Sequence, residues 1–254
     1  MSTSAPTVPT QEPLPLSEPQ RLANTFIAPS KTFADLKRKA TWWVPWLLLA
    51  LLSLIVAYLV ERKVGYDRVV ETSLKMAPKR AESLDRLSAD ERERQLSLHV
   101  HITQAAMYAG PLILLVIGIL VAAVLMATLN FVAGSEIGFK TSLAVLFYSW
   151  LPPSVVKTLI AAASMMTLGF APERFNIENP AATNLAALMV FPPPSPALYK
   201  LAAAVDIFSV WTILLLGLGF SYAGNVKRST ATLVVAAWYV FATLVGAAWA
   251  ALGM

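Results

Sequence analysis

Long apolar runs alternate with charged segments along this chain of 254 residues. Five of the runs are long enough to cross a bilayer, because its hydrocarbon core is about 30 Å thick and about 20 helical residues span it. These runs cover residues 42–60, 108–131, 142–169, 201–223 and 231–252. Inside lipid a helix satisfies its own backbone hydrogen bonds. The pattern predicts an all-α fold, a polytopic membrane bundle of five transmembrane helices within residues 42–254.

Two adjacent prolines, Pro152 and Pro153, lie inside the third apolar run. Each proline removes a backbone donor and crowds the preceding helical turn, so we expect the third helix to be broken there. In lipid the carbonyls that lose their partners need other donors, and Tyr148 and Ser149 are close enough in sequence to supply them. The break is interpreted as a structural kink or, alternatively, as a broken-helix binding point like those of transporters.

A strongly charged segment, residues 61–107, separates the first two runs. It holds nine of the twenty Lys/Arg and eight of the fifteen Asp/Glu, so it belongs in water. Ser88 and Glu91 match a capping box, in which each side chain caps the backbone of the other residue. Pro78 would interrupt a helix that continued from the first run. The segment is predicted to form a polar helical hairpin outside the bilayer.

The chain begins with residues 1–21, whose richness in Pro, Ser and Thr is typical of a disordered polar tail. A signal peptide starts with basic residues followed by an apolar core, and neither feature is present. Residues 22–41 are predicted to form an interfacial amphipathic segment, with Ser30 as a helix cap and Phe33 on the apolar side. A solvated lead-in to the first transmembrane helix is the alternative.

The remaining composition excludes several kinds of site. The chain has no cysteine, which removes disulfides, thiolate nucleophiles and thiolate metal ligands. Its net charge of +5 is not gathered into a basic stripe with interleaved aromatics, so nucleic acid is not an expected partner. His99 and His101 are two residues apart and point to different faces of a helix, unlike the pairs four apart that bind zinc. We expect no metal site.

Five transmembrane helices place the two termini on opposite sides of the membrane. If the N-terminus is cytoplasmic, the inner segments carry eight Lys/Arg and the outer segments eleven, nine of which lie within residues 61–107. The positive-inside rule weighs short flanks and the first helix most heavily. Because the short inner turns are basic at the membrane edge, we expect a cytoplasmic N-terminus and a C-terminus outside.

Three sequence patterns occur in order along the chain. The first joins FIAPSKTF at 26–33 to WWVP at 42–45, the second joins GFKTSL at 138–143 to YSWLP at 148–152, and the third is DIFSVW at 206–211. In the order and spacing of these patterns, the chain from about residue 22 onwards resembles a prokaryotic member of the Yip1 family of five-span membrane proteins.

The resemblance implies a helical bundle in a prokaryotic cytoplasmic membrane, with a cytosolic N-terminus, a C-terminus on the far side and no cofactor. Eukaryotic relatives are linked to vesicle traffic and bind prenylated small GTPases. This chain lacks the Asp-Leu-Tyr-Gly-Pro stretch associated with those relatives. The resemblance therefore leaves GTPase binding in doubt, and it implies no settled biochemical role for prokaryotic members.

Lys157 and Asp206 place charges inside the third and fourth runs. Charged residues within membrane spans are costly and usually face the bundle interior, which makes them functional candidates. Their expected depths differ by about 9 Å at a rise of about 1.5 Å per residue, a gap that a long lysine side chain can bridge. We expect the two to face each other, with Trp211 in the same candidate site. Alternatively, Lys157 snorkels to the interface and Asp206 caps the fourth helix.

These features favour an integral membrane scaffold or adaptor of the Yip1 type that acts through partner or lipid contacts within the bilayer. Its expected partners are the lipid bilayer and other membrane proteins or a second copy of the chain. The alternative is a small-solute or lipid transporter that uses the broken third span and the region of Lys157 and Asp206. Hydrolysis needs a constellation of Ser, Thr or carboxylate groups that the runs do not show, so we expect no enzyme. A water-accessible cavity at the charged pair would favour transport, and a dry bundle packed at Gly217 would favour scaffolding.

Overall fold

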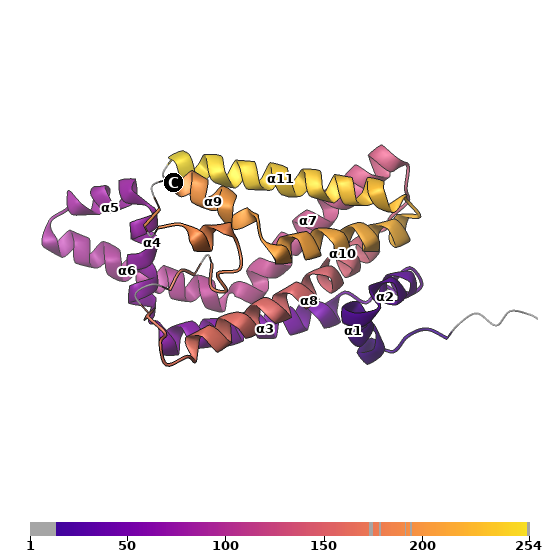
Figure 1. The fold of residues 1–254 in the computed structure, drawn as a ribbon, viewed down its shortest axis with the longest axis horizontal. Helices are drawn as coiled ribbons and strands as arrows, with labels where there is room; N and C mark the ends of the chain where they lie inside the picture. Colours follow the sequence, from indigo (N-terminus) through magenta and orange to yellow (C-terminus); the bar gives the residue numbers. More distant parts are fainter. Residues whose placement is uncertain (1–13, 173–174, 178, 191, 194, 253–254) are drawn as a thin grey trace, which may run out of the picture.

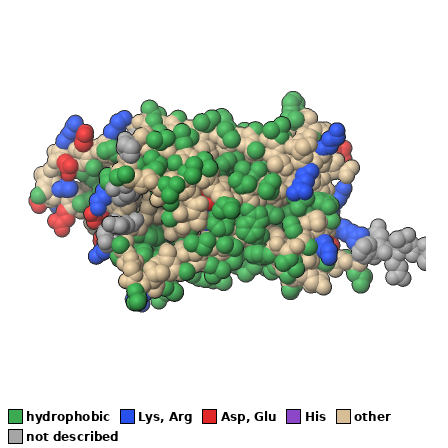
Figure 2. Space-filling view, in the orientation of Figure 1, with side chains coloured by type: hydrophobic (Ala, Val, Ile, Leu, Met, Phe, Trp, Pro, Cys, Tyr) green, Lys and Arg blue, Asp and Glu red, His purple; other side chains and the backbone are tan. Residues whose placement is uncertain are grey.

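Five helices that are long and apolar enough to cross a membrane run along the described part of the molecule (Figure 1). The computed structural model describes residues 14–252 except 173–174, 178, 191 and 194. The predicted all-α bundle of five transmembrane helices is confirmed. Figure 2 shows apolar side chains over the middle of the molecule and charged side chains at its two ends, as a bilayer requires. The five spans are α3 (Trp43–Lys63), α7 (Gly110–Ala133), α8 (Phe139–Met165), α10 (Ile207–Gly224) and α11 (Arg228–Leu252).

Helix α8 is the centre of the bundle. It packs against α3, α7 and α10, and more of it is buried than of any other span. Residues 142–149 are all buried, and residues 143–148 belong to the main apolar core. Phe147 of this stretch reaches Gly118 on α7, where an added Cβ would lie 2.6 Å from the ring. Close approach of this kind supplies the van der Waals contact that holds helices together in lipid.

The predicted break at Pro152 and Pro153 is wrong, because α8 continues through both prolines to Met165. Both prolines are buried, and neighbouring helices hold the backbone helical where two donors are missing. The two residues expected to supply new donors do not do so. Tyr148 donates its hydroxyl to Glu18 at 2.8 Å, and the buried Ser149 hydroxyl has no hydrogen-bond partner among the described residues.

The fourth span begins later than the predicted residue 201. A separate helix, α9 (Pro196–Ala204), packs beside α11, and α10 starts at Ile207 with Asp206 as its N-cap. Val205 leaves the helical conformation, with φ −81° and ψ 81°, and so separates the two helices. An aspartate that caps the new helix stabilises this start, which an apolar pattern alone cannot reveal.

Two short helices precede the first span at the end of the bundle opposite the C-terminus (Figure 1). Helix α1 (Glu18–Ile27) starts with a capping box in which Ser17 and Gln20 cap each other. The predicted disordered tail is therefore wrong for residues 18–21, because the capping box offsets their polar composition. Residues 1–13 lie outside the described residues.

Helix α2 (Pro29–Leu36) carries the apolar face that the sequence predicts. Its N-cap is Ala28 rather than Ser30, because Pro29 suits the first helical position. Phe33 is completely buried and lies against Gly219 of α10, where an added Cβ would stand 3.0 Å from its ring. The apolar face thus packs on protein, and contact of this segment with the lipid surface stays a prediction.

Beyond the end of α3, the charged segment folds as three helices, α4 (Tyr66–Met76), α5 (Pro78–Asp85) and α6 (Ala89–Tyr108). We call them the projection. Helix α4 lies at the base beside the bundle and packs against α6, and α5 and α6 extend outward from it with the turn between them at the far end (Figure 1). Gly65 turns the chain between α3 and α4 with a φ of 85°, a conformation that favours glycine. The capping box that starts α6 is present as predicted.

A second apolar cluster fixes the projection to the bundle. Tyr66 of α4 is buried in it and donates its hydroxyl to the carbonyl of Ala57 on α3 at 3.1 Å. Burial, with smaller contributions from Tyr108 and Glu61, raises the pKa of Tyr66 to about 12, so its hydroxyl stays a donor at neutral pH. The projection is therefore held at its base. The buried members of the cluster are Val60, Val64, Tyr66, Val69, Met165 and Phe175.

Candidate functional site

Lys157 and Asp206 meet inside the bundle. Lys157 Nζ lies 2.6 Å from Asp206 Oδ2 and joins α8 to the start of α10. The Asp206 side chain is 1% exposed and the Lys157 side chain 39%. Asp206 Oδ1 accepts hydrogen bonds from the Phe208 N–H at 3.2 Å and the Thr183 hydroxyl at 3.1 Å. Asp206 is thus both an ion-pair partner and a helix cap, because each role uses a different carboxylate oxygen.

The connector between α8 and α10 folds back toward this ion pair. Its short 3-10 helix η2 (Leu185–Leu188) packs against α9. Tyr239 of α11 donates its hydroxyl to the carbonyl of Ala204 at 2.7 Å. Tyr239 lies thirteen residues before Leu252 on α11, or about 20 Å at a rise of about 1.5 Å per residue. The ion pair therefore lies deep in the bundle rather than at its end.

Aromatic rings complete the surroundings of the ion pair. The Lys157 ammonium lies 5.8 Å from the centre of the Phe208 ring, within the range of a cation–π contact. Trp211 packs on the same ring at a centroid distance of 6.4 Å, so it supports Phe208 rather than the charges. A lone charge inside a membrane is costly, and this pairing reduces that cost.

An apolar cavity of about 510 Å³ lies between α7, α8, α10 and α11. This volume is within the range of about 300–1,000 Å³ that is usual for ligand pockets. Lys157 and Pro153 line it together with the hydroxyl-bearing Ser209 and Tyr239, whereas Asp206 does not. With Ser154 and Thr212, which also line it, the cavity presents one ammonium group and four hydroxyl-bearing side chains on a largely apolar wall, an arrangement that suits an amphipathic ligand. The other candidates on α8 do not line it: Tyr148, Ser149 and Pro152.

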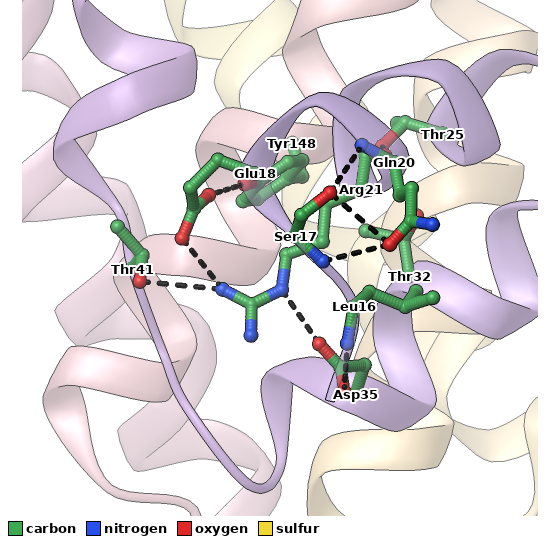
Figure 3. Close-up of polar contacts among 10 residues, drawn as sticks. All are labelled: Leu16, Ser17, Glu18, Gln20, Arg21, Thr25, Thr32, Asp35, Thr41 and Tyr148. Carbon is green, nitrogen blue, oxygen red and sulfur yellow. Dashed lines mark hydrogen bonds and ion pairs between the residues drawn. The ribbon is translucent and has the colours of Figure 1, made fainter. Parts of the chain in front are cut away.

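A second polar cluster lies at the N-terminal end of the bundle (Figure 3), where no sequence pattern above predicts one. Arg21 is 1% exposed, and its Nε lies 2.6 Å from Asp35 Oδ2. Its Nη1 lies 2.8 Å from Glu18 Oε1 and donates to the Thr41 hydroxyl at 3.3 Å. Glu18 also accepts the hydrogen bond from Tyr148. We call these five residues the N-terminal network, and they tie α1 and α2 to α8.

The sequence carries only a faint signal for the N-terminal network. Ser17 and Gln20 have capping-box spacing, and Glu18 and Arg21 have the i, i+3 spacing of a helical ion pair. Both signals predict a helix at this point. The burial of Arg21 depends on contacts that are distant in sequence, and a local pattern cannot show it.

A family model described as the Yip1 domain matches residues 23–250. The chain belongs to the Yip1 family. The Yip1 domain and the five apolar helices of the described part together make it a multi-pass membrane protein. No curated protein and no solved structure matches the chain. The Yip1 domain includes both members of the ion pair, Lys157 and Asp206, whereas Arg21 precedes it.

Proposed function

We propose that this Yip1 protein is a membrane scaffold or adaptor without catalytic activity, which presents fixed polar surfaces on both sides of the bilayer. The observation that carries this proposal is the anchored projection. Its inner face is held by the second apolar cluster, while its charged side chains are exposed over α5 and the start of α6. A fixed, charged surface of this kind is suited to contacts with another protein.

The opposite end of the bundle has the same design. The N-terminal network holds the inner faces of α1 and α2, while Lys31, Lys37 and Lys39 remain exposed around them. The two polar surfaces are thus joined by a packed core. A rigid connection between two sides of a membrane is what an adaptor needs, because movement of its surfaces would weaken simultaneous binding.

Scaffolding is supported over transport by the continuity of α8 and by the close contact between α10 and α11. At Gly217 an added Cβ would lie 2.8 Å from Cα of Thr232, so the two backbones nearly touch. The cavity beside Lys157 is not lined by any residue of the buried stretch 142–149 of α8. A transporter of the broken-helix type has interrupted helices at its binding point, whereas α8 is one continuous helix.

The scaffold proposal predicts specific crosslinks from the projection in native membranes. A photo-crosslinking amino acid at the exposed Glu93 is expected to capture one or a few discrete proteins, to be identified by mass spectrometry. The matched control places the same amino acid at Leu120, which is 60% exposed on the apolar face of α7 and is expected to yield lipid adducts. An absence of protein adducts from Glu93, Arg86 and Lys37 alike would count against scaffolding.

We propose further that the protein lies in a prokaryotic cytoplasmic membrane with its N-terminus in the cytoplasm. Because the chain has no cysteine, single cysteines report position without background. A membrane-impermeant thiol reagent applied to intact cells is expected to label Ser83→Cys on the projection and to leave Lys37→Cys unlabelled until the cells are opened. The reverse result would overturn the orientation, and labelling of both in intact cells would overturn the assignment of the two ends to opposite sides.

A further inference from the structure

Three hollows on the half of the molecule nearest the projection share lining residues, and they follow one another along one path beside α11. The first, the mouth, is a pocket of about 390 Å³ among α4, α5, α6, α9 and the end of α11. The second is a groove of about 690 Å³ along α7 and α11, and the third is the interior cavity beside Lys157. Lys200 and Ala250 line both the mouth and the groove, and Val121 and Trp238 line both the groove and the cavity.

The chemistry of this path changes from basic to apolar along its length. Lys79, Arg80, His99 and Lys200 line the mouth, and its described lining residues include no Asp or Glu. Lys79 also donates to the carbonyl of Leu252, which ties the mouth to the end of α11. Lysine and arginine side chains donate charge-assisted hydrogen bonds to phosphate oxygens. The groove below it is walled by large apolar side chains, among them Phe241, Val245 and Trp249.

The length of the groove matches one leaflet of a bilayer. Its lining residues on α11 run from Ala250 to Trp238, a distance of about 18 Å at a rise of about 1.5 Å per residue. Half of a hydrocarbon core is about 15 Å thick. A lipid with its head group at the mouth would therefore bring the end of an acyl chain to Trp238, which lines both the groove and the cavity.

We propose that this path binds one anionic phospholipid. The phosphate lies among the basic side chains of the mouth, and one acyl chain follows the groove between α7 and α11 to the interior cavity. A free phosphate ion would fill the mouth and leave the apolar groove unused. The inference goes beyond the scaffold role and does not depend on it.

Lipid binding by the full chain in detergent micelles tests the basic mouth. Native mass spectrometry with phosphatidylglycerol and phosphatidylcholine of identical chains is expected to show at least about tenfold tighter binding of the anionic lipid, since each basic residue near a charged membrane surface adds appreciable affinity. Arg80→Gln, at an exposed residue that lines the mouth, is expected to weaken phosphatidylglycerol binding about fivefold and to leave phosphatidylcholine unchanged. Lys140→Gln, an exposed lysine at the other end of the bundle, is the matched control.

Photo-crosslinking tests the groove. Phosphatidylglycerol with a diazirine near the end of one acyl chain is expected to label peptides of α7 and α11 around Val121 and Trp238. Gly246 lines the groove, and an added Cβ there meets nothing within 4 Å. Gly246→Phe is therefore expected to fill the groove and abolish this labelling without unfolding the bundle, whereas Gly246→Ala keeps it.

Three results would overturn the proposal. The first is equal affinity for the two lipids, and the second is labelling spread evenly over all lipid-facing helices, which would indicate surrounding lipid only. The third is full displacement of phosphatidylglycerol by millimolar inorganic phosphate, which would indicate an ion site. A melting temperature of Gly246→Phe within a few degrees of the unchanged protein shows that lost labelling is not unfolding.

Discussion

Replacing Asp206 with asparagine is expected to lower the free energy of unfolding by about 3 kcal/mol, because removal of one partner leaves the Lys157 charge within a membrane span without compensation. The asparagine oxygen still accepts from the Phe208 N–H and the Thr183 hydroxyl, so the cap of α10 is kept and only the ion pair is lost. Lys157 is 39% exposed and can relax toward the cavity, which puts the loss at the lower end of the usual range. Unfolding of the purified protein by SDS titration measures it.

The double variant Lys157→Met with Asp206→Asn separates the ion pair from other effects. With both charges absent, stability is expected to return to within about 1 kcal/mol of the unchanged protein, since apolar replacements of buried ion pairs are often neutral. Glu136→Gln, an exposed carboxylate in the turn before α8, is the control and is expected to change nothing. Simple addition of the two single effects would show that the charges do not interact.

The five spans and the polar hairpin follow from the sequence because each depends on a long, local pattern. A run of about 20 apolar residues has one stable arrangement in lipid, and a capping box such as that of Ser88 and Glu91 fixes a helix start. The pairing of Lys157 with Asp206 can also be predicted from the sequence. Two costly charges in neighbouring antiparallel spans have few other ways to be neutralised.

The errors have a common physical origin in tertiary contacts. Pro152 and Pro153 have strong local effects, but the packing of α8 against three helices overrides them. The late start of α10 depends on the connector, which folds back to meet Asp206. The basic mouth gathers residues from α5, α6 and α9 that no spacing rule connects. Local patterns therefore predict elements well and their junctions poorly.

Replacing Arg21 with methionine is expected to release α1 and α2 from the bundle without unfolding the five spans. The substitution leaves the carboxylate of Asp35, which is 7% exposed, and that of Glu18 near each other without their shared cation. Removal of one partner from a buried ion pair costs about 3–5 kcal/mol. Here the loss of stability is expected to be confined to α1 and α2, two short helices at one end of the molecule. Amide hydrogen exchange in α1 and α2 should accelerate about a hundredfold or more, since about 3 kcal/mol corresponds to that factor.

The pattern of exchange decides whether the N-terminal network acts locally. Amides in the packed stretch 142–149 of α8 are expected to keep their protection, because α8 also packs against α3, α7 and α10, which do not contact Arg21 through any bond of the N-terminal network. Lys37→Met removes an exposed cation from the same end and is expected to leave exchange unchanged. Adding Asp35→Asn to Arg21→Met should restore part of the protection, since it removes the stranded charge. Equal acceleration in α8 would show instead that α1 and α2 unfold together with the bundle, and the adaptor surface would then have no independent anchor.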